Sequence, residues 1–251
     1  MHKETNKSET DKSETDKSKS GKINQGNLTQ WFHYLLVAAM LVGSALCWSS
    51  APEQIPIHWN IQGEVDGFGG KLPSLLFLPV VAIGLHILLG FLPTIDPGAA
   101  NYEQFKRTFR TIRLLPTVIF FVIHSVLLAH AIGHHPDMSL IVGCAFGLVM
   151  IVIGNCLGKV HPNWFVGIRT PWTLSSKLAW TKTHRIGGWL FVVLGVGILI
   201  AAVVNSAWAI PIGLVSVVAS SLGLVVYSWC VWRSDPDRIH PVGTSPVSGE
   251  K

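Results

Sequence analysis

The side chains that could carry chemistry gather in two short stretches between long apolar runs. In the first, residues 51–71, His58, Glu64 and Asp66 offer nitrogen and oxygen atoms of the kind that bind metal ions. Their spacing matches no known ligand set, and a histidine beside a tryptophan at a membrane surface needs no metal. We expect this stretch to recognise an external ligand instead. The residues expected to form that surface are Pro56, His58, Trp59, Asn60, Gly63 and Asp66.

The second stretch, residues 155–187, is polar, basic and rich in tryptophan. Its leading residue is Arg169, because a guanidinium group can hold a carboxylate or a phosphate through two parallel hydrogen bonds. Asn155, Asn163, Thr170 and His184 are expected to support it as polar neighbours. The full candidate site is Asn155, Pro162, Asn163, Gly167, Arg169, Thr170, Pro171, Trp172, Trp180, His184 and Arg185.

Catalytic patterns are absent from the sequence. It contains no HExxH helix, no GxSxG turn, no phosphate-binding glycine loop and no paired carboxylates at the end of an apolar run. The four cysteines lack the spacing of a zinc or redox site. His86, His124 and His130 lie in apolar runs without aspartate or glutamate, which argues against proton-coupled transport. The sequence therefore indicates a protein that is not an enzyme and has no cofactor.

Apolar blocks position these two stretches. Nearly half of the 251 residues are hydrophobic, and they occur in blocks close to the roughly 20 residues that cross a bilayer as a helix. Each block is too long and too uniform for a membrane barrel strand, and a helix satisfies its own backbone in lipid. The fold class is therefore all-α, a polytopic membrane protein with six transmembrane helices. The expected spans are residues 31–49, 72–92, 112–133, 138–154, 188–204 and 208–232.

The distribution of basic residues predicts the orientation. All but one of the 19 lysines and arginines fall in the two tails and in the second and fourth loops, and the exception is Lys71. Because basic residues near span ends stay in the cytoplasm, both termini should be cytoplasmic in a multi-pass plasma-membrane protein. This topology also explains the net charge of +5, so we expect no direct binding of nucleic acid.

The chain divides into two membrane regions flanked by tails. Residues 1–30 repeat the unit Lys-Ser-Glu-Thr-Asp and should form a disordered cytoplasmic tail, because they contain too little apolar surface to fold. Residues 31–137 form a three-span region with an external loop at 50–71. Residues 138–232 form a second three-span region with a cytoplasmic loop at 155–187, and 233–251 are a cytoplasmic tail. We interpret the run 31–49 as a retained span, since its leader is longer than that of a usual signal peptide.

Local patterns add four expectations. Ile55, Ile57, Trp59 and Ile61 alternate with polar residues, so a short extended segment or hairpin in the external loop should place these four on one face. In the fourth loop, Ser175 or Ser176 should cap a short helix that reaches about Arg185.

Tryptophans and glycines supply the other two. The tryptophans at 164, 172, 180 and 189 should anchor the fourth loop in the headgroup layer. Glycines 143, 147, 154 and 158 share a narrow helix face that another helix can approach closely, within this chain rather than in a dimer.

Residues 51–232 resemble the SdpI family, most strongly at 154–189. The matching residues include Gly154-Asn155, the run Pro162 to Ser175 and Thr183-His184-Arg185. Ile55-Pro56-Ile57-His58-Trp59-Asn60, followed by Gly63, Asp66 and Lys71, resembles the short domain of unknown function that often precedes that family's region.

The resemblance implies a bacterial immunity protein in the plasma membrane. The family's namesake protects the producing cell against a secreted membrane-active peptide toxin and sequesters a cytoplasmic transcriptional repressor. The implied partners are thus membrane lipids, a peptide toxin outside and a repressor inside. A small-solute transporter, or a membrane signalling protein without an immunity role, remains the alternative.

Overall fold

The computed structural model describes residues 28–60, 63–204 and 209–238. In this part of the chain six helices are long and apolar enough to cross a membrane, which confirms the all-α, six-span prediction. The long helices are the first helix, Leu28–Cys47, then α2 Lys71–Ile95, α3 Lys106–Ala131, α4 Met138–Leu157, α6 Lys177–Val203 and α7 Ala209–Arg233. The short elements are β1 Gln54–Trp59, β2 Val65–Gly70, a 3₁₀ helix at Ala99–Phe105 and α5 Pro171–Leu174. The predicted disordered tail lies almost entirely outside the described residues.

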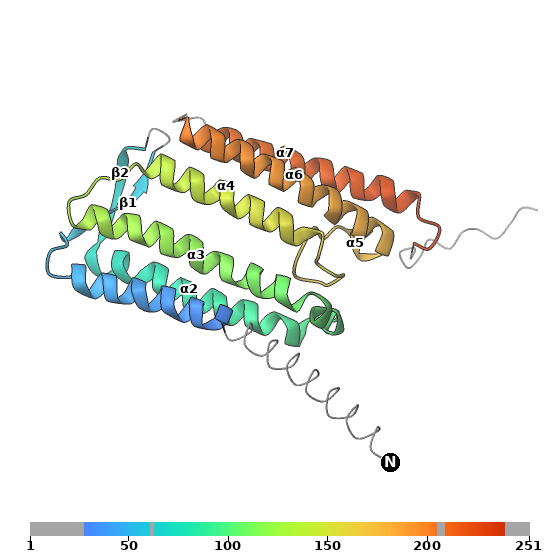
Figure 1. The fold of residues 1–251 in the computed structure, drawn as a ribbon, viewed down its shortest axis with the longest axis horizontal. Coiled ribbons are helices and arrows are strands. Elements are labelled where there is room, and N and C mark those ends of the chain that lie inside the picture. Colours follow the sequence, from blue (N-terminus) through green and yellow to red (C-terminus); the bar gives the residue numbers. More distant parts are fainter. Residues whose placement is uncertain (1–27, 61–62, 205–208, 239–251) are drawn as a thin grey trace, which may run out of the picture.

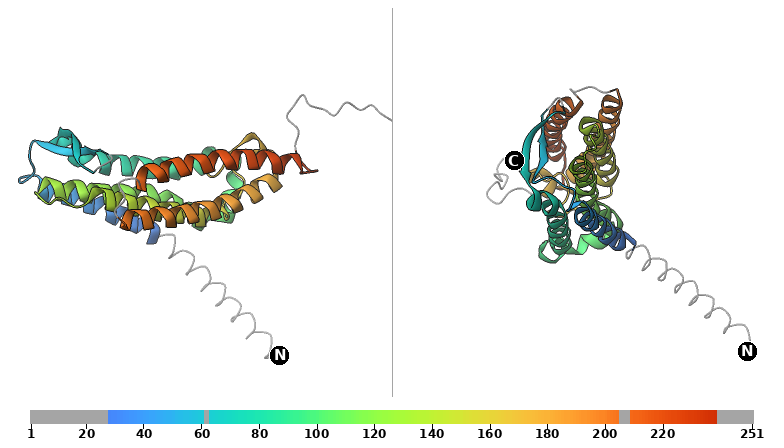
Figure 2. Two further views of the ribbon diagram at one scale, coloured as in Figure 1. Left: turned by 90° about the horizontal axis from the view of Figure 1, so that it is seen from above. Right: turned by 90° about the vertical axis from the view of Figure 1, so that its left-hand side faces the viewer.

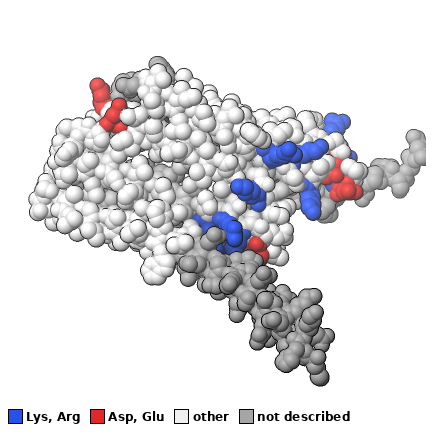
Figure 3. Space-filling model, viewed as in Figure 1, with Lys and Arg blue, Asp and Glu red and all other residues white. Residues whose placement is uncertain are grey.

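The long helices lie side by side along the long axis of the molecule, with α3 and α4 in the middle (Figure 1). Helix α2 packs on α3, α3 on α4, and α4 and α7 both on α6. The β1–β2 hairpin lies at one end, the hairpin end, and α5 with the α4–α6 loop lies at the other (Figures 1 and 2). On the face in Figure 3, lysine and arginine gather toward the second end, the basic end.

The outer surface of the helices is apolar. Phe77, Val193 and Val215 each keep more than 60% of their surface exposed although they lie within long helices. A water-soluble bundle would turn such side chains inward, whereas lipid tails are a favourable environment for them. This exposed apolar surface therefore agrees with helices that face a bilayer.

Glycines let α4 and α6 approach backbone to backbone. A Cβ on Gly147 would lie 2.8 Å from the Gly195 carbonyl oxygen, and one on Gly154 would lie 2.6 Å from that of Gly188. Gly143 meets Ala202 in the same interface. The predicted glycine face is therefore confirmed as an intramolecular one. It ends before Gly158, whose Cβ position has no atom within 4 Å.

Polar side chains link the first helix to α2 and α3. His33 Nδ1 lies 2.9 Å from Thr117 Oγ1, and its ring stacks on that of His86 with 3.5 Å between centroids. Arg113 Nε donates to the His86 carbonyl at 2.8 Å. Farther toward the hairpin end, His124 Nε2 lies 2.9 Å from the hydroxyl of Ser44. His33, His86 and His124 therefore lie in contacts between helices.

Two local expectations were wrong. Ser176 does cap a helix, through the Ala179 amide, but this helix continues to Val203 and forms one element with the fifth span. Hydropathy did not predict one continuous helix, because the first turns of α6 carry basic residues and only the later turns are apolar. In the hairpin, Ile55 is fully buried while Ile57 is 49% exposed, because the strand register shifts between Pro56 and His58. Ile61 lies outside the described residues.

Candidate functional site

The loop between α4 and α6 is organised around the side chain of Asn163. This side chain is 2% exposed. Its Oδ1 accepts hydrogen bonds from the Phe165 amide at 2.9 Å and the Val166 amide at 2.6 Å. Its Nδ2 donates to the carbonyls of His161 at 2.8 Å and Val166 at 2.9 Å. One amide group therefore satisfies four backbone groups, which only asparagine or glutamine has the donors and acceptors to do.

A buried carboxylate from the other half of the chain supports this turn. Asp96, which follows α2, is 4% exposed and accepts a hydrogen bond from the Gly98 amide at 2.6 Å. It also accepts from the Trp164 amide at 3.1 Å and from the Tyr102 hydroxyl at 2.8 Å. Asp96 was not predicted as a site residue. The sequence feature that could have identified it is its place, since Asp96 is an acidic residue directly after an apolar run.

His184 fixes the loop to α6. Its ring is 1% exposed and stacks on Trp180 with 4.1 Å between centroids. Nδ1 lies 2.8 Å from the Trp180 carbonyl, and Nε2 accepts the Ile168 amide at 3.0 Å. Since a carbonyl can only accept and an amide can only donate, these two contacts assign the neutral ring with its proton on Nδ1.

Gly167 is required at this contact. Its φ is +114°, which disfavours any residue with a Cβ, and a Cβ there would lie 2.3 Å from His184 Nε2. The loop backbone can therefore approach the imidazole only because residue 167 has no side chain.

Two more contacts join the loop to α7 and to the residues that follow it. Thr170 caps α5, with Pro171 in the first helical turn and a reciprocal hydrogen bond to Thr173. The Thr170 hydroxyl also lies 2.9 Å from the hydroxyl of Ser228 on α7. At the end of the loop, the Ser176 hydroxyl donates to the carboxylate of Asp235. Polar side chains thus hold the loop against α2, α6 and α7 together.

Arg169 is a charged candidate residue that this network leaves accessible. Its side chain is exposed, and one guanidinium nitrogen donates to the Trp164 carbonyl at 2.7 Å. No carboxylate of the described residues lies within ion-pair distance of it. An arginine fixed at one nitrogen keeps several N–H donors free for an external anion.

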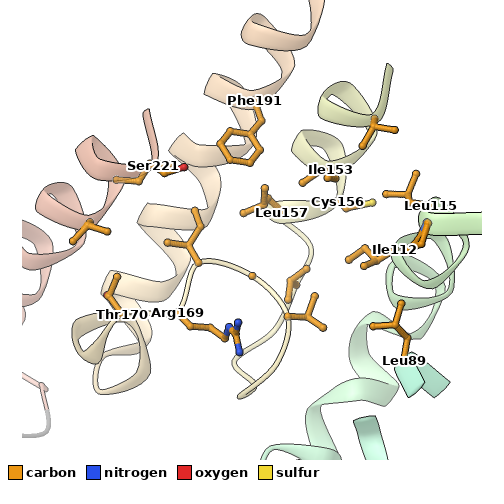
Figure 4. Close-up of a pocket in the computed structure, with 18 of the residues that line it drawn as sticks. Leu89, Ile112, Leu115, Ile153, Cys156, Leu157, Arg169, Thr170, Phe191 and Ser221 are labelled. Carbon is orange, nitrogen blue, oxygen red and sulfur yellow. The ribbon is translucent and has the colours of Figure 1, made fainter. Parts of the chain in front are cut away.

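A cavity of about 620 Å³ adjoins Arg169. Its walls come from α2, α3, α4, α6, α7 and the loop, so it lies between α2 and α3 on one side and α4, α6 and α7 on the other (Figure 4). Leu115, Ile153, Phe191 and Leu224 represent the four main helices in its lining. We call it the loop cavity.

The other predicted loop residues have different surroundings. Asn155 lies in the last part of α4 and donates to the Ile151 carbonyl, away from the Asn163 turn. Arg185 is exposed on α6. Trp180 was expected to be an interfacial anchor, and this was wrong, because it is 2% exposed and donates to the Val160 carbonyl at 2.8 Å. Trp164 and Trp189 are 56% and 70% exposed, as an anchor requires.

The hairpin brings the external candidates together at the opposite end of the bundle. His58 Nδ1 and Asp66 Oδ1 are 2.5 Å apart across the strands. Asn60 Nδ2 donates to the Glu64 carboxylate at 3.1 Å, and Gly63 completes the turn with φ of +82°.

The hairpin is fixed to α3. The Trp59 ring lies edge-on to His130 with 5.3 Å between centroids. Within the described residues, no group of three or more potential ligands could hold a metal ion.

Comparison with known proteins finds two family models on this chain. Residues 159–228 match the SdpI/YfhL protein family, and residues 35–83 match a domain of unknown function, DUF1648. The chain is also similar to the immunity protein SdpI of Bacillus subtilis (strain 168). The two are 24% identical over 192 residues, which is 76% of this chain and 88% of that protein. No solved structure matches. The resemblance seen in the sequence is confirmed, with the first region beginning earlier than expected.

Proposed function

We propose that this multi-pass membrane protein, with its SdpI/YfhL region behind a DUF1648 region, is an immunity protein that protects a bacterium against a secreted membrane-active peptide toxin. The similarity to an immunity protein over most of both chains carries the proposal. The arrangement of the bundle supports it, because two differently built polar surfaces lie at opposite ends of one set of membrane helices. No enzymatic step is part of the proposed function.

The basic end faces the cytoplasm in this proposal. The amino ends of α3 and α6 and the carboxyl end of α7 lie there and carry lysine and arginine, whereas the hairpin end has Lys71 next to Glu53. Basic residues beside membrane spans are retained in the cytoplasm. Both termini are then cytoplasmic, and the hairpin is external.

The hairpin would meet the toxin. Its exposed surface combines a hydrogen-bonded pair, His58 and Asp66, with the apolar side chains of Ile57 and Phe68, which are 49% and 58% exposed. A membrane-active peptide is amphipathic and can contact both kinds of surface. The same end packs on α2 and α3 through Ile55, so a contact there reaches the membrane helices.

The fourth loop would carry the cytoplasmic function. Lys177, Lys182 and Arg185 are exposed on the first turns of α6, which follow Arg169 and α5 in sequence and lie at the same end of the bundle. Such a basic surface favours a partner with an acidic surface. A repressor that the loop sequesters would therefore need an acidic patch. The toxin could regulate this binding only if it stabilises one helix arrangement over another.

The experiment compares toxin protection at matched abundance. A toxin-sensitive bacterium expresses wild type, Arg169→Ala or Lys159→Ala and is challenged with a peptide of the sporulation-delaying type. Lys159 is the control because it is an exposed cation of the same loop, outside the hydrogen-bond network. Survival with wild type and Lys159→Ala, and loss with Arg169→Ala, is the expected result.

Two outcomes would count against this assignment. No protection by a correctly inserted wild-type protein would reject immunity to that peptide and favour the transporter or signalling alternative. Equal protection by all three proteins would leave immunity standing and remove Arg169 from its mechanism.

A further inference from the structure

The loop cavity is apolar and lies at membrane depth. Leu115, Ile153 and Leu224 come from three different spanning helices. The Ser221 hydroxyl, one of the few polar groups in the lining, already donates to the Val217 carbonyl of its own helix at 2.8 Å. A cavity with such walls offers contact area but few directional partners, so it suits an apolar ligand. In a membrane, the ligand present at high concentration is a lipid acyl chain.

One end of the loop cavity differs from the rest. There the loop contributes Gly167, Arg169 and Thr170, and the close-up view shows the Arg169 side chain at this end (Figure 4). Thr170 is occupied by its cap and by Ser228. Arg169 therefore supplies the free hydrogen-bond donors at this end of the cavity.

Arg169 forms no ion pair within the described part of the chain. Asp96 is the buried acid of this region, and two backbone amides and the Tyr102 hydroxyl satisfy its carboxylate. It makes no ion pair with Arg169. The guanidinium thus has a fixed position and no ion-pair partner among the described residues. An anionic phosphate diester is the complementary group at the depth where membrane helices end.

We propose that the loop cavity binds one anionic phospholipid, with an acyl chain in the cavity and the phosphate on Arg169. Neither the phosphate contact nor the acyl-chain contact would bind a ligand tightly alone. An exposed arginine binds a free phosphate poorly in water, and an acyl chain without a head-group contact is exchanged freely with the bilayer. Joined in one molecule, the two contacts define a site. The inference goes beyond the proposed function, because lipid binding does not depend on immunity.

The site also has a structural consequence. The cavity walls include Leu89 and Ile112 from the first three-span region and Leu157 and Leu224 from the second. A lipid there would fill the space between the two regions and contact the loop backbone at Gly167. The bound lipid should therefore hold the loop in the arrangement described above.

The test uses the purified full chain in detergent and native mass spectrometry. Phosphatidylglycerol is titrated in parallel with phosphatidylcholine, and inorganic phosphate is a third probe. Wild type should retain one phosphatidylglycerol about tenfold more tightly than phosphatidylcholine, because the choline cation offsets the phosphate charge in phosphatidylcholine and phosphatidylglycerol keeps a net negative charge for Arg169. Inorganic phosphate should show no binding at the same concentrations.

Three variants separate the two halves of the site. Arg169→Gln should lose the preference for phosphatidylglycerol but still bind lipid, and Lys159→Gln should behave as wild type. Ile153→Trp, which fills the cavity from α4, should bind neither lipid in this mode. Wild-type binding by Ile153→Trp would overturn the proposal, because the lipid would then lie elsewhere. An equal loss of preference in Lys159→Gln would also overturn it, since general surface charge would explain the selectivity.

Discussion

Gly167→Ala should break the contact between the loop and α6. A residue with a Cβ at φ of +114° pays about 1–3 kcal/mol of backbone strain. The new Cβ also occupies the space of His184 Nε2, so the Ile168 amide loses its acceptor. Leaving this part-buried donor unpaired costs about 1–3 kcal/mol more. The free energy of opening the loop should therefore fall by about 2–6 kcal/mol.

Hydrogen–deuterium exchange of the protein in lipid nanodiscs measures this opening. Amides of residues 161–176 should exchange about 30-fold faster or more in Gly167→Ala, because each 1.4 kcal/mol changes an equilibrium tenfold. The matched control is Gly158→Ala, whose Cβ has no atom within 4 Å and whose φ is −67°. Its exchange should equal that of wild type.

A double-mutant cycle isolates the contribution of the imidazole. In a His184→Ala background, Gly167→Ala should cost only its backbone strain, because the ring that it displaces is gone. The two substitutions should therefore be coupled by about 1–3 kcal/mol. Additive effects, or wild-type exchange in Gly167→Ala, would refute the reasoning about this contact.

Three further substitutions test other parts of the structure. Gly154→Leu should force α4 and α6 apart and lower the free energy of unfolding by about 1–3 kcal/mol or more, which would appear as loss of monodisperse protein after solubilisation. Gly197→Leu, with open space at its Cβ position, should remain monodisperse. Asp96→Ala should lower the melting temperature more than Tyr102→Phe, because it leaves the Gly98 and Trp164 amides without this acceptor, whereas Tyr102→Phe removes one hydroxyl donor at a cost of about 0.5–1.5 kcal/mol. The reverse order would contradict this network. His58→Ala should leave the melting temperature unchanged, since its pair with a carboxylate is exposed, and should lower toxin protection; full protection would exclude His58 from toxin recognition.

Hydropathy and local spacing predicted the membrane architecture well. Six apolar blocks became six long helices, and the glycine pattern of the fourth block became the α4–α6 interface at Gly147 and Gly154. Both features depend on residues close together in sequence, so periodicity reveals them. The hairpin did not follow the simple alternation, because its register shifts between Pro56 and His58 and again between His58 and Trp59, and Ile57 is exposed while Ile55 is buried.

The support of the candidate site could not be predicted in the same way. Asp96 and Trp164 are 68 residues apart, and Ser176 and Asp235 are 59 apart, so no local pattern pairs them. Trp180 shows a second reason why the sequence did not predict the site's support. Tryptophan suits both an interface and a buried position, and only the tertiary contact with the Val160 carbonyl distinguishes them. Which loop residues serve function beyond this structural role stays a prediction.

The most direct measurement of the central claim is the membrane potential of toxin-challenged cells. A sensitive strain that expresses the wild-type protein is compared with the same strain carrying an empty vector, after addition of the sporulation-delaying type of peptide. The account predicts that the vector strain depolarises and dies, while the expressing strain keeps its potential and survives. Equal depolarisation of both strains, with the protein shown to be inserted in the membrane, would contradict immunity to this peptide.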